Sequence, residues 1–597
     1  MMKKDILPLA QLRDYMHKNN LDAYIIPMTD PHMSEYVADH WRSVKWFSGF
    51  SGSAGNIVVT QNFAGLWTDS RYFIQAEEQL NNSGIELVKL TIPHTPEYID
   101  WLSKNLAQNA KVGFDGKTFS YGLAKLMQTK FERKNIQIVP DFDFVSEYWK
   151  SRPGIPQNKV FEHDLKYAGK SRQEKITDLR NKMNELSADY HLLSSLDDIA
   201  WLFNLRGNDI MYNPLFISFA LISTNEAFLF VDNQKLSDEL KQKLIANKII
   251  IKDYNEVYAY LETLNKGKSI IADLSKTNYS LYKSIPEHCT IINKISIAAA
   301  LKSIKNKREI EHLRKVHEKD GVAMVKFLYW LDKNIGKEKI TEISAGEKLL
   351  SFRKEQAEFF GESFGIISAY GAHAAMPHYS ANEKTNVELK AESFYLVDSG
   401  GQYFNGTTDI TRTVMLGTPT EEEKRDFTLA LKGTIDLAMT IFPYGTKGVQ
   451  LDAIARKPLW DNKMNYGHGT GHGVGFFLNV HEGPQSISTR NAGIQEETLE
   501  EGMYLSDEPA FYRAGKHGIR IENLMIVQVA EENDYGKFMK FETLTLCPID
   551  TKPIDTGLLN KFETDWLNNY HKIVFEKLSP YLNDDEKNWL AEKTKAI

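Results

Sequence analysis

The chain has 597 residues, enough for three or four domains that each bury a hydrophobic core of their own. Its 42% hydrophobic and 25% charged residues are typical of a globular protein exposed to water. The formal net charge of −7 offers no basic surplus for binding nucleic acid, and no apolar run is long enough to cross a membrane. We therefore expect neither a nucleic acid nor a membrane among its partners.

The N-terminal segment MMKKDILPLAQLRDY contains two lysines but lacks the apolar stretch of a secretory signal. Two cysteines, Cys289 and Cys547, are too few for a disulfide framework. We expect a cytoplasmic protein in which both cysteines are small buried residues.

Residues 12–140 predict a first domain in which apolar β-runs alternate with helical patterns, as in an α/β fold with helices packed on a sheet. The same order returns in degenerate form over residues 161–300. There NPLFISFALIST corresponds to GNIVVT, and EAFLFVDNQK corresponds to AGLWTDSRYF. Self-similarity over so long a span predicts a duplicated domain.

Two stretches have the composition of linkers, Trp149–Asn158 and the residues around Ile297–Ile304. They predict three domains, residues 1–155, 156–301 and 302–597, the last with a C-terminal extension.

Arg71 lies in the motif WTDSRYF, and the second copy of the repeat has no arginine at this place. An ion pair with Asp69 at the end of a strand would explain it structurally. However, an arginine needed only for that strand end should recur in both copies. A role in a binding site is therefore the alternative, and the sequence leaves both open.

A helical pattern extends from Ile310 to Leu331, and TEISAGEKLLSFRKEQ predicts a second helix. His312 and His317 are five residues apart, a poor spacing for two ligands on one helix face. We interpret them as part of a solvated face.

Residues 394–413, FYLVDSGGQYFNGTTDITRT, predict two β-runs joined by a glycine-rich segment with Asn405-Gly406 as a turn signal. Asp398 ends the first run and Asp409 begins the second, so the hairpin brings two carboxylates toward each other. A divalent cation would relieve their repulsion, and oxygen ligands favour Mn or Mg. Two solvated loop aspartates would give the same sequence, so both interpretations are open at this point.

The register of this hairpin poses a difficulty. A two-residue turn at Asn405-Gly406 places both aspartates on one face but four residues out of step. At about 3.3 Å per residue the offset is about 13 Å, whereas paired metal ions lie about 3.5–4 Å apart. Either a bulge or a turn nearer Tyr403-Phe404 is therefore required.

Two glycine-rich segments carry histidines. GIISAYGAHAAMPHYSA contains His373 and His378, and NYGHGTGHGVGFFLNVHEGP contains His468, His472 and His481 among six glycines. Imidazole binds metals and carries protons near neutral pH. A single histidine would be explained as a structural residue, but three within fourteen residues, beside glycines that admit close backbone approach, favour a site.

Two glutamates follow in MYLSDEPAFYRAGKHGIRIENLMIV. Glu508 precedes Pro509, and Glu522 lies in a β-run expected from Ile519 to Val527, where Arg520 should share its face. A glutamate in an apolar run is costly to bury without a partner, and a metal would supply one. An oxygen-rich set with one nitrogen, suited to two hard divalent ions and a shared water, thus consists of Asp398, Asp409, His472, Glu508 and Glu522.

Five ordered motifs carry a resemblance to a known family: VDSGGQYFNGTTDITRT, GHGTGHGVG, NVHEGP, SDEPAFY and GIRIEN. WFSGFSGSAG near the start and DWLNNYH near the end extend the match over essentially the whole chain. The chain resembles the pita-bread metallopeptidases, and closely the three-domain cytosolic Xaa-Pro aminopeptidases (aminopeptidase P). This resemblance implies an α/β (α+β) fold: two related creatinase-like domains, then a pita-bread catalytic domain that forms a homodimer.

The resemblance also implies roles for the candidate residues. The five ligands would hold two divalent ions, usually Mn, with Asp409 and Glu522 bridging both. Substrate contacts would come from Arg71, His378, His472 and His481, and support for the site from His468, Tyr512 and Arg520. His373 matches none of these roles, and the context PHYSA favours His378 over it as the substrate-contacting histidine.

The implied reaction is hydrolysis of the N-terminal Xaa-Pro bond of a peptide that has proline second. Water shared by the ions would be deprotonated near neutral pH and attack the carbonyl before proline. Glu508 would pass the proton to the proline nitrogen, and His378 and His481 would stabilise the tetrahedral oxygen. The free α-amine would bind near Asp398, which makes the enzyme an exopeptidase.

Three other functions occur on this scaffold. One is an Xaa-Pro dipeptidase, or prolidase; the second is a creatinase-type hydrolase without metals; the third is a non-catalytic peptide-binding relative. The complete ligand set argues against the second and the third. Metal analysis, and a comparison of dipeptide with longer substrates, would distinguish the functions.

Overall fold

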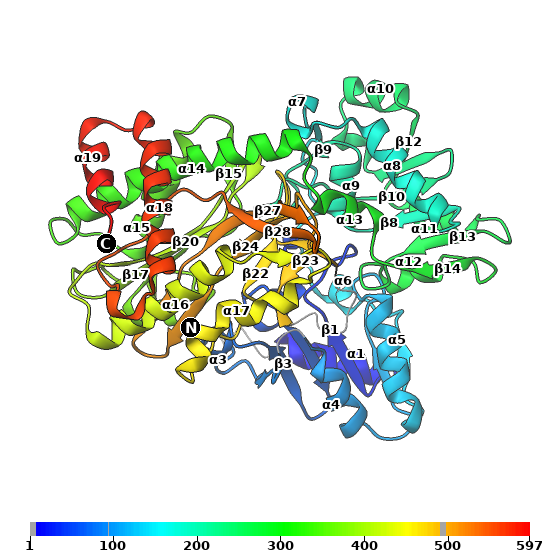
Figure 1. Cartoon of the computed structure of the whole chain (residues 1–597). Coiled ribbons are helices and arrows are strands. Elements are labelled where there is room, and N and C mark those ends of the chain that lie inside the picture. The colour runs from blue at the N-terminus through cyan, green and yellow to red at the C-terminus, as the bar shows by residue number, and fades with distance from the viewer. Residues whose placement is uncertain (1–6, 93–94, 490–496) are drawn as a thin grey trace. The chain divides into compact units, whose positions relative to one another are not determined.

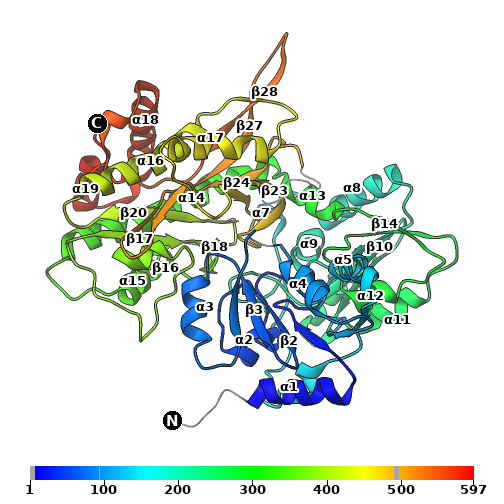
Figure 2. The ribbon, with the colours of Figure 1, turned by 90° about the horizontal axis from the view of Figure 1, so that it is seen from below.

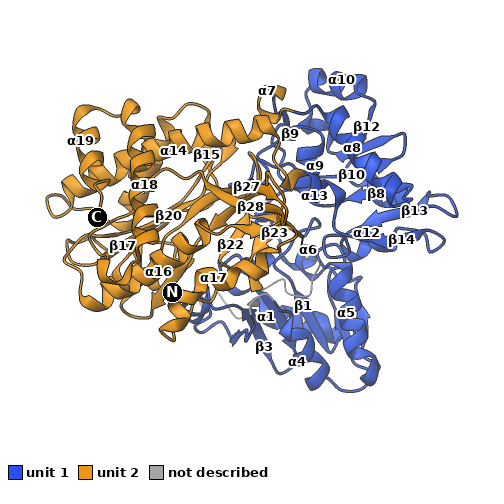
Figure 3. Ribbon diagram, viewed as in Figure 1, with its two compact units in different colours: residues 1–164, 170–301 blue, residues 165–169, 302–597 orange. Residues whose placement is uncertain are grey.

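The computed structural model describes residues 7–92, 95–489 and 497–597 (Figure 1). The first six residues of the segment tested for a secretory signal lie outside these ranges. The chain separates into two compact units (Figure 3): unit 1 is residues 1–164 and 170–301, and unit 2 is residues 165–169 and 302–597. No helix within the described ranges is both long and apolar enough to cross a membrane.

Unit 1 contains two six-stranded mixed sheets. The strands of the first are β1 (Ala23–Ile26), β2 (Asn56–Thr60), β3 (Ala64–Thr68), β4 (Glu86–Lys89), β5 (Lys111–Gly113) and β6 (Gln137–Val139). Those of the second are β8 (Tyr190–Leu193), β10 (Ser218–Ser223), β11 (Ala227–Val231), β12 (Ile249–Lys252), β13 (Ser269–Ala272) and β14 (Thr290–Asn293). A short antiparallel pair joins β7 (Phe161–Glu162) and β9 (Leu205–Arg206).

The two sheets have the same topology, β4-β3-β2-β1-β5-β6 and β12-β11-β10-β8-β13-β14. In each, the strand that comes first in the chain pairs antiparallel on one side and parallel on the other. The β-runs matched by sequence, β2 with β10 and β3 with β11, hold equivalent places. The predicted duplication is therefore confirmed.

The helices of unit 1 follow the expected α/β alternation. They are α1 (Leu7–Lys18), α2 (Ser43–Ser48), α3 (Phe73–Gln79), α4 (Glu97–Asn105), α5 (Tyr121–Phe131), α6 (Phe144–Tyr148), α8 (Arg172–Glu185), α9 (Leu196–Leu202), α10 (Asp238–Ala246), α11 (Glu256–Glu262), α12 (Tyr279–Lys283) and α13 (Ile297–Ser303). The second expected linker thus forms helix α13.

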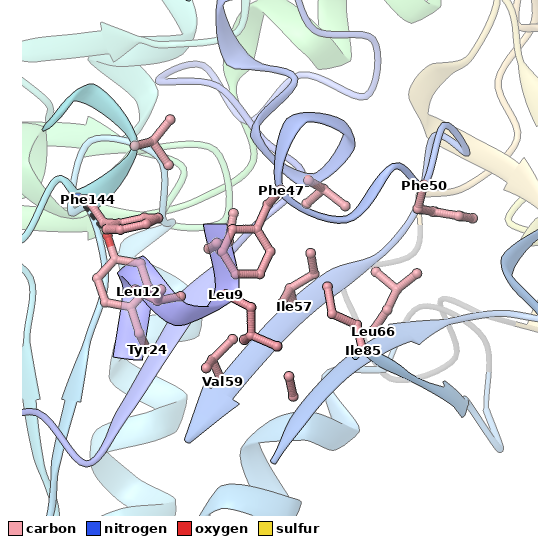
Figure 4. Packing of buried hydrophobic residues seen from close by; sticks show 14 of the residues in the cluster. Leu9, Leu12, Tyr24, Phe47, Phe50, Ile57, Val59, Leu66, Ile85 and Phe144 are labelled. Atoms are coloured by element: carbon pink, nitrogen blue, oxygen red, sulfur yellow. Dashed lines mark hydrogen bonds between the residues drawn. The ribbon is translucent and has the colours of Figure 1, made fainter. Parts of the chain in front are cut away.

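Both faces of the first sheet are buried. Tyr24, Ile57 and Val59 belong to the hydrophobic cluster that also contains residues of α1 and α6 (Figure 4). Their neighbours along the strands, Ile25 and Val58, belong to the cluster on the opposite face. Because side chains alternate across a strand, burial of both faces produces the continuous apolar runs seen in the sequence.

Unit 2 contains four sheets whose described pairs are antiparallel, with strand orders β15-β18-β19, β16-β17-β20, β21-β28-β27-β24-β22-β23 and β25-β26. The bounds are β15 (Phe359–Glu362), β16 (Ile367–Tyr370), β17 (Phe394–Ser399), β18 (Gly401–Tyr403), β19 (Gly406–Thr407), β20 (Ile410–Met415), β21 (Phe442–Pro443), β22 (Gly471–Gly473), β23 (Glu482–Ile487), β24 (Tyr504–Asp507), β25 (Ala510–Arg513), β26 (His517–Arg520), β27 (Asn523–Asn533) and β28 (Gly536–Thr543). Figure 2 shows the tip of the β27–β28 hairpin projecting from this unit, where Tyr535 is 92% exposed.

The helices of unit 2 are α7 (Leu165–Ala168), α14 (Lys307–Asn334), α15 (Glu342–Lys354), α16 (Glu421–Ala438), α17 (Gly448–Asp461), α18 (Lys561–Leu578) and α19 (Asp584–Lys593). In Figure 1, α16 and α17 pack against each other, and both contact the six-stranded sheet. The two helices predicted after residue 305 are confirmed as α14 and α15.

The prediction of a solvated face for the histidines of α14 is wrong for His317. Its side chain is buried, and Nε2 lies 2.6 Å from the hydroxyl of Tyr504 on β24. Burial lowers the pKa of His317 to about 4, so the ring is neutral near pH 7. The tyrosine hydroxyl supplies the partner that lets a polar ring occupy the buried face of this helix. Cys289 and Cys547 are buried and unbridged, as expected.

Candidate metal centre

The β17–β20 hairpin brings Asp398 and Asp409 closer than the turn signal predicted. Tyr403 pairs with Gly406, so the two-residue turn is Phe404-Asn405, one residue earlier than expected. Asp398 pairs with Thr411, and in this register Asp409 lies opposite Gly400. The two aspartates are thus diagonal neighbours across the strand pair and on one face, with their Cα atoms about 7–8 Å apart. Of the two alternatives considered, the earlier turn is correct.

Gly406 explains why the Asn405-Gly406 pair predicted the turn one residue too late. Its φ is +151°, and a Cβ atom there would lie 2.9 Å from Val316 Cγ1 on α14. The glycine is required for this close approach of the hairpin to the helix, not for the turn itself.

Asp398 is buried and bound on one side by an arginine. Its Oδ2 accepts a hydrogen bond from Arg520 Nη2, while Oδ1 has no hydrogen-bond partner among the described residues. Burial raises the pKa of Asp398 to about 6; Arg520 lowers it and the charge of Asp409 raises it. The free oxygen is therefore a buried acceptor without a counter-charge of its own.

Asp409, His472 and Glu522 form the most compact group. One ligand atom from each lies within 4.8 Å of the others. His472 Nδ1 lies 2.9 Å from the carbonyl of Gly473, which leaves Nε2 facing Asp409 Oδ2 at 3.5 Å. A hydrogen bond from one ring nitrogen to a carbonyl is the usual arrangement of a histidine whose other nitrogen binds a metal.

Glu508 completes the cluster from the end of β24. Its Oε1 lies 3.6 Å from His472 Nε2, and its backbone N–H donates to the carbonyl of Thr470 at 2.8 Å. Burial raises the pKa of Glu522 well above its ordinary value, and the charges of Asp409 and Glu508 add to the rise. Burial lowers the pKa of His472, but these carboxylates outweigh it and raise the value to about 9. The site thus has a strongly negative field that favours cations.

One strand from Ile519 to Val527 was expected to carry Arg520 and Glu522, and this is wrong. The structure has β26 up to Arg520 and β27 from Asn523, with Glu522 between them. The backbone N–H of Glu522 donates to the carbonyl of Thr411 instead of continuing a single ladder. Arg520 and Glu522 still meet at one atom, Thr411 Oγ1, which donates to Glu522 Oε2 at 2.7 Å and accepts from Arg520 Nε at 3.1 Å.

His481 and His468 both lie beside the cluster, His481 against His472 and His468 with Nδ1 3.8 Å from Glu508 Oε2. The ring of His481 is 4.4 Å from that of His472, at 80°. His468 Nε2 is 2.7 Å from the hydroxyl of Tyr512, which also accepts from Arg520 Nη1 at 2.5 Å. A chain of hydrogen bonds therefore leads from His468 through Tyr512 and Arg520 to Asp398.

His378 lies in the loop between β16 and β17 and is half-buried. His373, which had no role in the sequence analysis, lies 2.8 Å from the carboxylate of Glu342.

Arg71 follows β3 in unit 1. Its Nε and Nη2 donate to the two oxygens of Asp69 at 2.8 and 2.7 Å, and the two side chains are 8% and 2% exposed. The ion pair expected from the structural explanation is therefore present. Arg71 belongs to unit 1 and the cluster to unit 2, and a role for Arg71 in substrate binding stays a prediction.

Sequence reasoning missed three neighbours of the ligands. Thr411 follows Asp409 at the two-residue spacing of a shared strand face, a signal that could have identified it. Ser506 accepts from the His472 N–H at 2.9 Å and donates to Glu508 Oε1 at 3.3 Å. Asp507 is fully buried, and neither oxygen has a hydrogen-bond partner in the described part of the chain.

A buried ion pair between Arg353 and Asp320 contacts the hairpin that carries the two aspartates. Arg353 on α15 donates to both oxygens of Asp320 on α14 at 2.8 and 3.0 Å. The same groups reach the hairpin, because Tyr403 donates to Asp320 at 2.8 Å and Arg353 donates to the Ser399 carbonyl at 3.3 Å. The first arm of the hairpin, which carries Asp398, is thus anchored to the two helices at β17 and β18.

The residues present fit a metal site. Four carboxylates and an imidazole converge, Oδ1 of Asp398 has no hydrogen-bond partner among the described residues, and the pKa of each of Asp398, Glu508 and Glu522 is raised by burial. Divalent cations would balance these charges, and oxygen-rich ligation suits hard metals.

Comparison with known proteins agrees with this geometry. Two profiles described as Creatinase/Prolidase N-terminal domain match residues 8–142 and 151–309, and Metallopeptidase family M24 matches residues 311–528. The C-terminal region of peptidase M24 matches residues 537–597. A Coprinopsis cinerea protein named "Probable Xaa-Pro aminopeptidase P" is 40% identical over 99% of this chain and 98% of its own. This chain belongs to the aminopeptidase P family of M24 metallopeptidases.

Solved structures agree with the assignment to the aminopeptidase P family. An X-prolyl aminopeptidase from Caenorhabditis elegans, described as a cytosolic enzyme with a di-nuclear active site, is 36% identical with a TM-score of 0.95. That match covers 100% of both chains. An Xaa-Pro dipeptidase from Bacillus anthracis is 23% identical over 64% of this chain, with a TM-score of 0.51, and shares the fold alone. The predicted fold, two creatinase-like domains followed by a pita-bread domain, is confirmed.

Proposed function

We propose that this chain is a metal-dependent aminopeptidase that releases the first residue of peptides with proline in the second position. The observation that carries the proposal is the cluster of Asp409, His472 and Glu522 with Asp398 and Glu508 beside it. It lies in a chain similar over its full length to proteins named for this activity.

The five ligands would hold two divalent ions, with Mn as the preferred metal. Asp409, His472, Glu508 and Glu522 would supply ligand atoms, and Asp398 would contribute the oxygen that has no partner among the described residues. When bound, such ions act as Lewis acids and lower the pKa of a water molecule into the neutral range.

The chain's own residues would then handle protons and orientation. Glu508 would accept the proton of the attacking water and deliver it to the proline nitrogen. His481, whose ring lies against that of His472, would donate a hydrogen bond to the carbonyl oxygen as charge develops, and His378 would assist it. Asp398 would bind the free α-amine, which restricts cleavage to the N-terminal bond.

An Xaa-Pro dipeptidase is the second candidate, because prolidases share this fold. Nothing in the described cluster favours it, and the dipeptidase comparison covers only 64% of the chain. The domain boundaries at residues 155 and 301, a cytoplasmic location, and a homodimer formed through the C-terminal domain belong to the same proposal. They rest on the resemblance, with the cytosolic description of the nematode enzyme in support of the location.

Removal of the metal provides the test. We expect purified protein to contain about two divalent ions per chain, and exhaustive chelation to abolish hydrolysis of an Xaa-Pro-Yaa tripeptide. Added Mn should restore the activity, as followed by release of the free first residue. Full activity in chelated protein with no measurable metal would contradict the proposal.

Arg71 is proposed to bind substrate beyond the proline, since a guanidinium suits peptide carbonyls and carboxylates. We expect Arg71→Ala to lower kcat/KM for tripeptides and longer peptides without changing the metal content. Because Asp69 would lose its buried partner, the variant should also melt at a lower temperature.

Asp69→Asn separates the two effects of Arg71→Ala. It weakens the same ion pair but keeps the guanidinium, so we expect a similar loss of melting temperature with a smaller loss of kcat/KM. Equal kinetic losses in the two variants, or none in Arg71→Ala, would return Arg71 to the structural explanation.

A further inference from the structure

A buried carboxylate organises the loop that carries His378. Glu342, the first residue of α15, is 0% exposed. Its Oε1 accepts from the backbone N–H of Tyr370 at 2.8 Å, and its Oε2 accepts from the backbone N–H of Val387 at 3.3 Å. One side chain thus binds both ends of the segment 370–387.

Two side chains of the same loop bind this carboxylate. His373 Nδ1 lies 2.8 Å from Oε1, and the hydroxyl of Tyr379 donates to Oε2 at 2.8 Å. The rings of His373 and Tyr379 also stack, with centroids 4.5 Å apart. We call Glu342, His373 and Tyr379 the Glu342 hub. It gives His373 the role that the sequence left unassigned.

The four donors explain how Glu342 can be buried. A carboxylate away from water is costly unless its oxygens are hydrogen-bonded, and each oxygen here has one backbone and one side-chain donor. Loss of the His373 or Tyr379 donor removes one of the four hydrogen bonds and leaves the carboxylate and its two backbone donors less firmly held. The hub can therefore loosen without unfolding of α15.

His378 lies between two residues that are anchored from different directions. Tyr379 binds Glu342, while the carbonyl of Pro377 accepts from Arg520 Nη2 at 3.4 Å. Arg520 also binds Asp398 of the metal cluster. The backbone of His378 is thus fixed between the hub and an arginine that contacts a proposed ligand.

The same loop packs tightly on β26. A Cβ atom added to Gly518 would lie 1.7 Å from the carbonyl oxygen of Ala374, so this strand accepts the loop only at a glycine. The loop therefore has little freedom to shift as a body. Release of the hub would act mainly on the part that follows Ala374, which includes His378.

We propose that the Glu342 hub is a positioning device for His378. His373 and Tyr379 are positioning residues: they hold the loop so that His378 meets the scissile carbonyl. The inference rests on the proposed function, which assigns substrate contact to His378. Misplacement of a reacting group by about 1 Å can cost on the order of a hundredfold in rate, so a partial loosening should be measurable.

Kinetics of variants test the proposal. We expect His373→Ala and Tyr379→Phe each to lower kcat for an Xaa-Pro-Yaa tripeptide roughly tenfold, a smaller loss than the about 10²–10⁴ expected for removal of a catalytic group. KM and metal content should stay close to wild type. His373→Asn, whose side-chain amide can replace Nδ1–H as donor, should restore most of kcat. His312→Ala, a half-buried histidine of the same unit, should have no effect and serves as the control.

A double-variant cycle shows whether the hub acts through His378. If it does, His373→Ala should have no further effect on kcat in a His378→Ala background. Multiplicative losses would overturn the proposal, because the hub would then act elsewhere. A loss in His378→Ala with wild-type kcat in both hub variants would overturn the hub alone and leave the proposed function standing.

A second readout does not depend on activity. The backbone N–H groups of Tyr370 and Val387 donate to Glu342, so we expect faster amide hydrogen exchange in peptides covering residues 370–387 of His373→Ala and Tyr379→Phe. Unchanged exchange in both variants would contradict anchoring by the hub. If the wild-type protein cleaved no Xaa-Pro substrate, the proposed function would fail, and exchange would still decide whether the hub holds the loop.

Discussion

Asp409→Asn is expected to abolish turnover, by at least about a thousandfold, since loss of Lewis-acid stabilisation is worth several kcal/mol. Asparagine has the same shape but no charge, and Asp409 lies in the group of three ligand atoms within 4.8 Å of one another. The bound metal should fall with the activity. Metal analysis of the purified variant, together with tripeptide hydrolysis, gives both measurements.

The electrostatics of the cluster also predict the direction in which Asp409→Asn changes the melting temperature of the metal-free protein. The charge of Asp409 raises the pKa of Asp398 and of Glu522, so in metal-free protein it repels two carboxylates, and against these stands one attraction, to His472, whose pKa it also raises. We therefore expect metal-free Asp409→Asn to melt no lower than metal-free wild type. Asp461→Asn, an exposed position on α17, should change neither activity nor metal content. Wild-type turnover in Asp409→Asn would contradict a mechanism that depends on two metal ions.

His481→Ala is expected to keep both metal ions and lose roughly 10²–10⁴ in kcat, the usual value of a hydrogen-bonding or proton-transferring group. His481 precedes β23, and its ring lies 4.4 Å from that of His472. It is outside the group of three ligand atoms, and we assign it to the substrate. Metal content and kcat measured on the same preparation test this assignment.

His472→Ala is the matched comparison for His481. The two rings are in contact, and His472 directs Nε2 toward Asp409 and Glu508. We expect His472→Ala to lose metal and activity together, while His481→Ala loses activity alone. A parallel fall of metal in His481→Ala would make His481 a ligand.

Much of the fold follows from local pattern. The duplication could be predicted from the sequence because both copies bury both sheet faces and therefore repeat continuous apolar runs in the same order. Helix α14 could be predicted from its apolar spacing. The burial of His317 could not be predicted, since its partner Tyr504 lies 187 residues away.

The site was predictable in its residues and less so in its geometry. Asp398 and Asp409 were recognised from their motif, yet the turn was misplaced because Gly406 serves contact with α14 rather than the turn. Glu522 was placed inside a strand that in fact breaks there to bind Thr411. The partners of His373 could not be found, because Glu342 lies 31 residues earlier in a segment with no catalytic signature.

The most direct test of the central claim is identification of products from a set of related peptides by mass spectrometry. The set contains Xaa-Pro-Yaa-Yaa, the same peptide with alanine second, its N-acetylated form, and the dipeptide Xaa-Pro. The account predicts release of the first residue from Xaa-Pro-Yaa-Yaa, and little or no cleavage of the alanine and acetylated peptides. Cleavage of the dipeptide alone, or of an internal bond in the acetylated peptide, would contradict it.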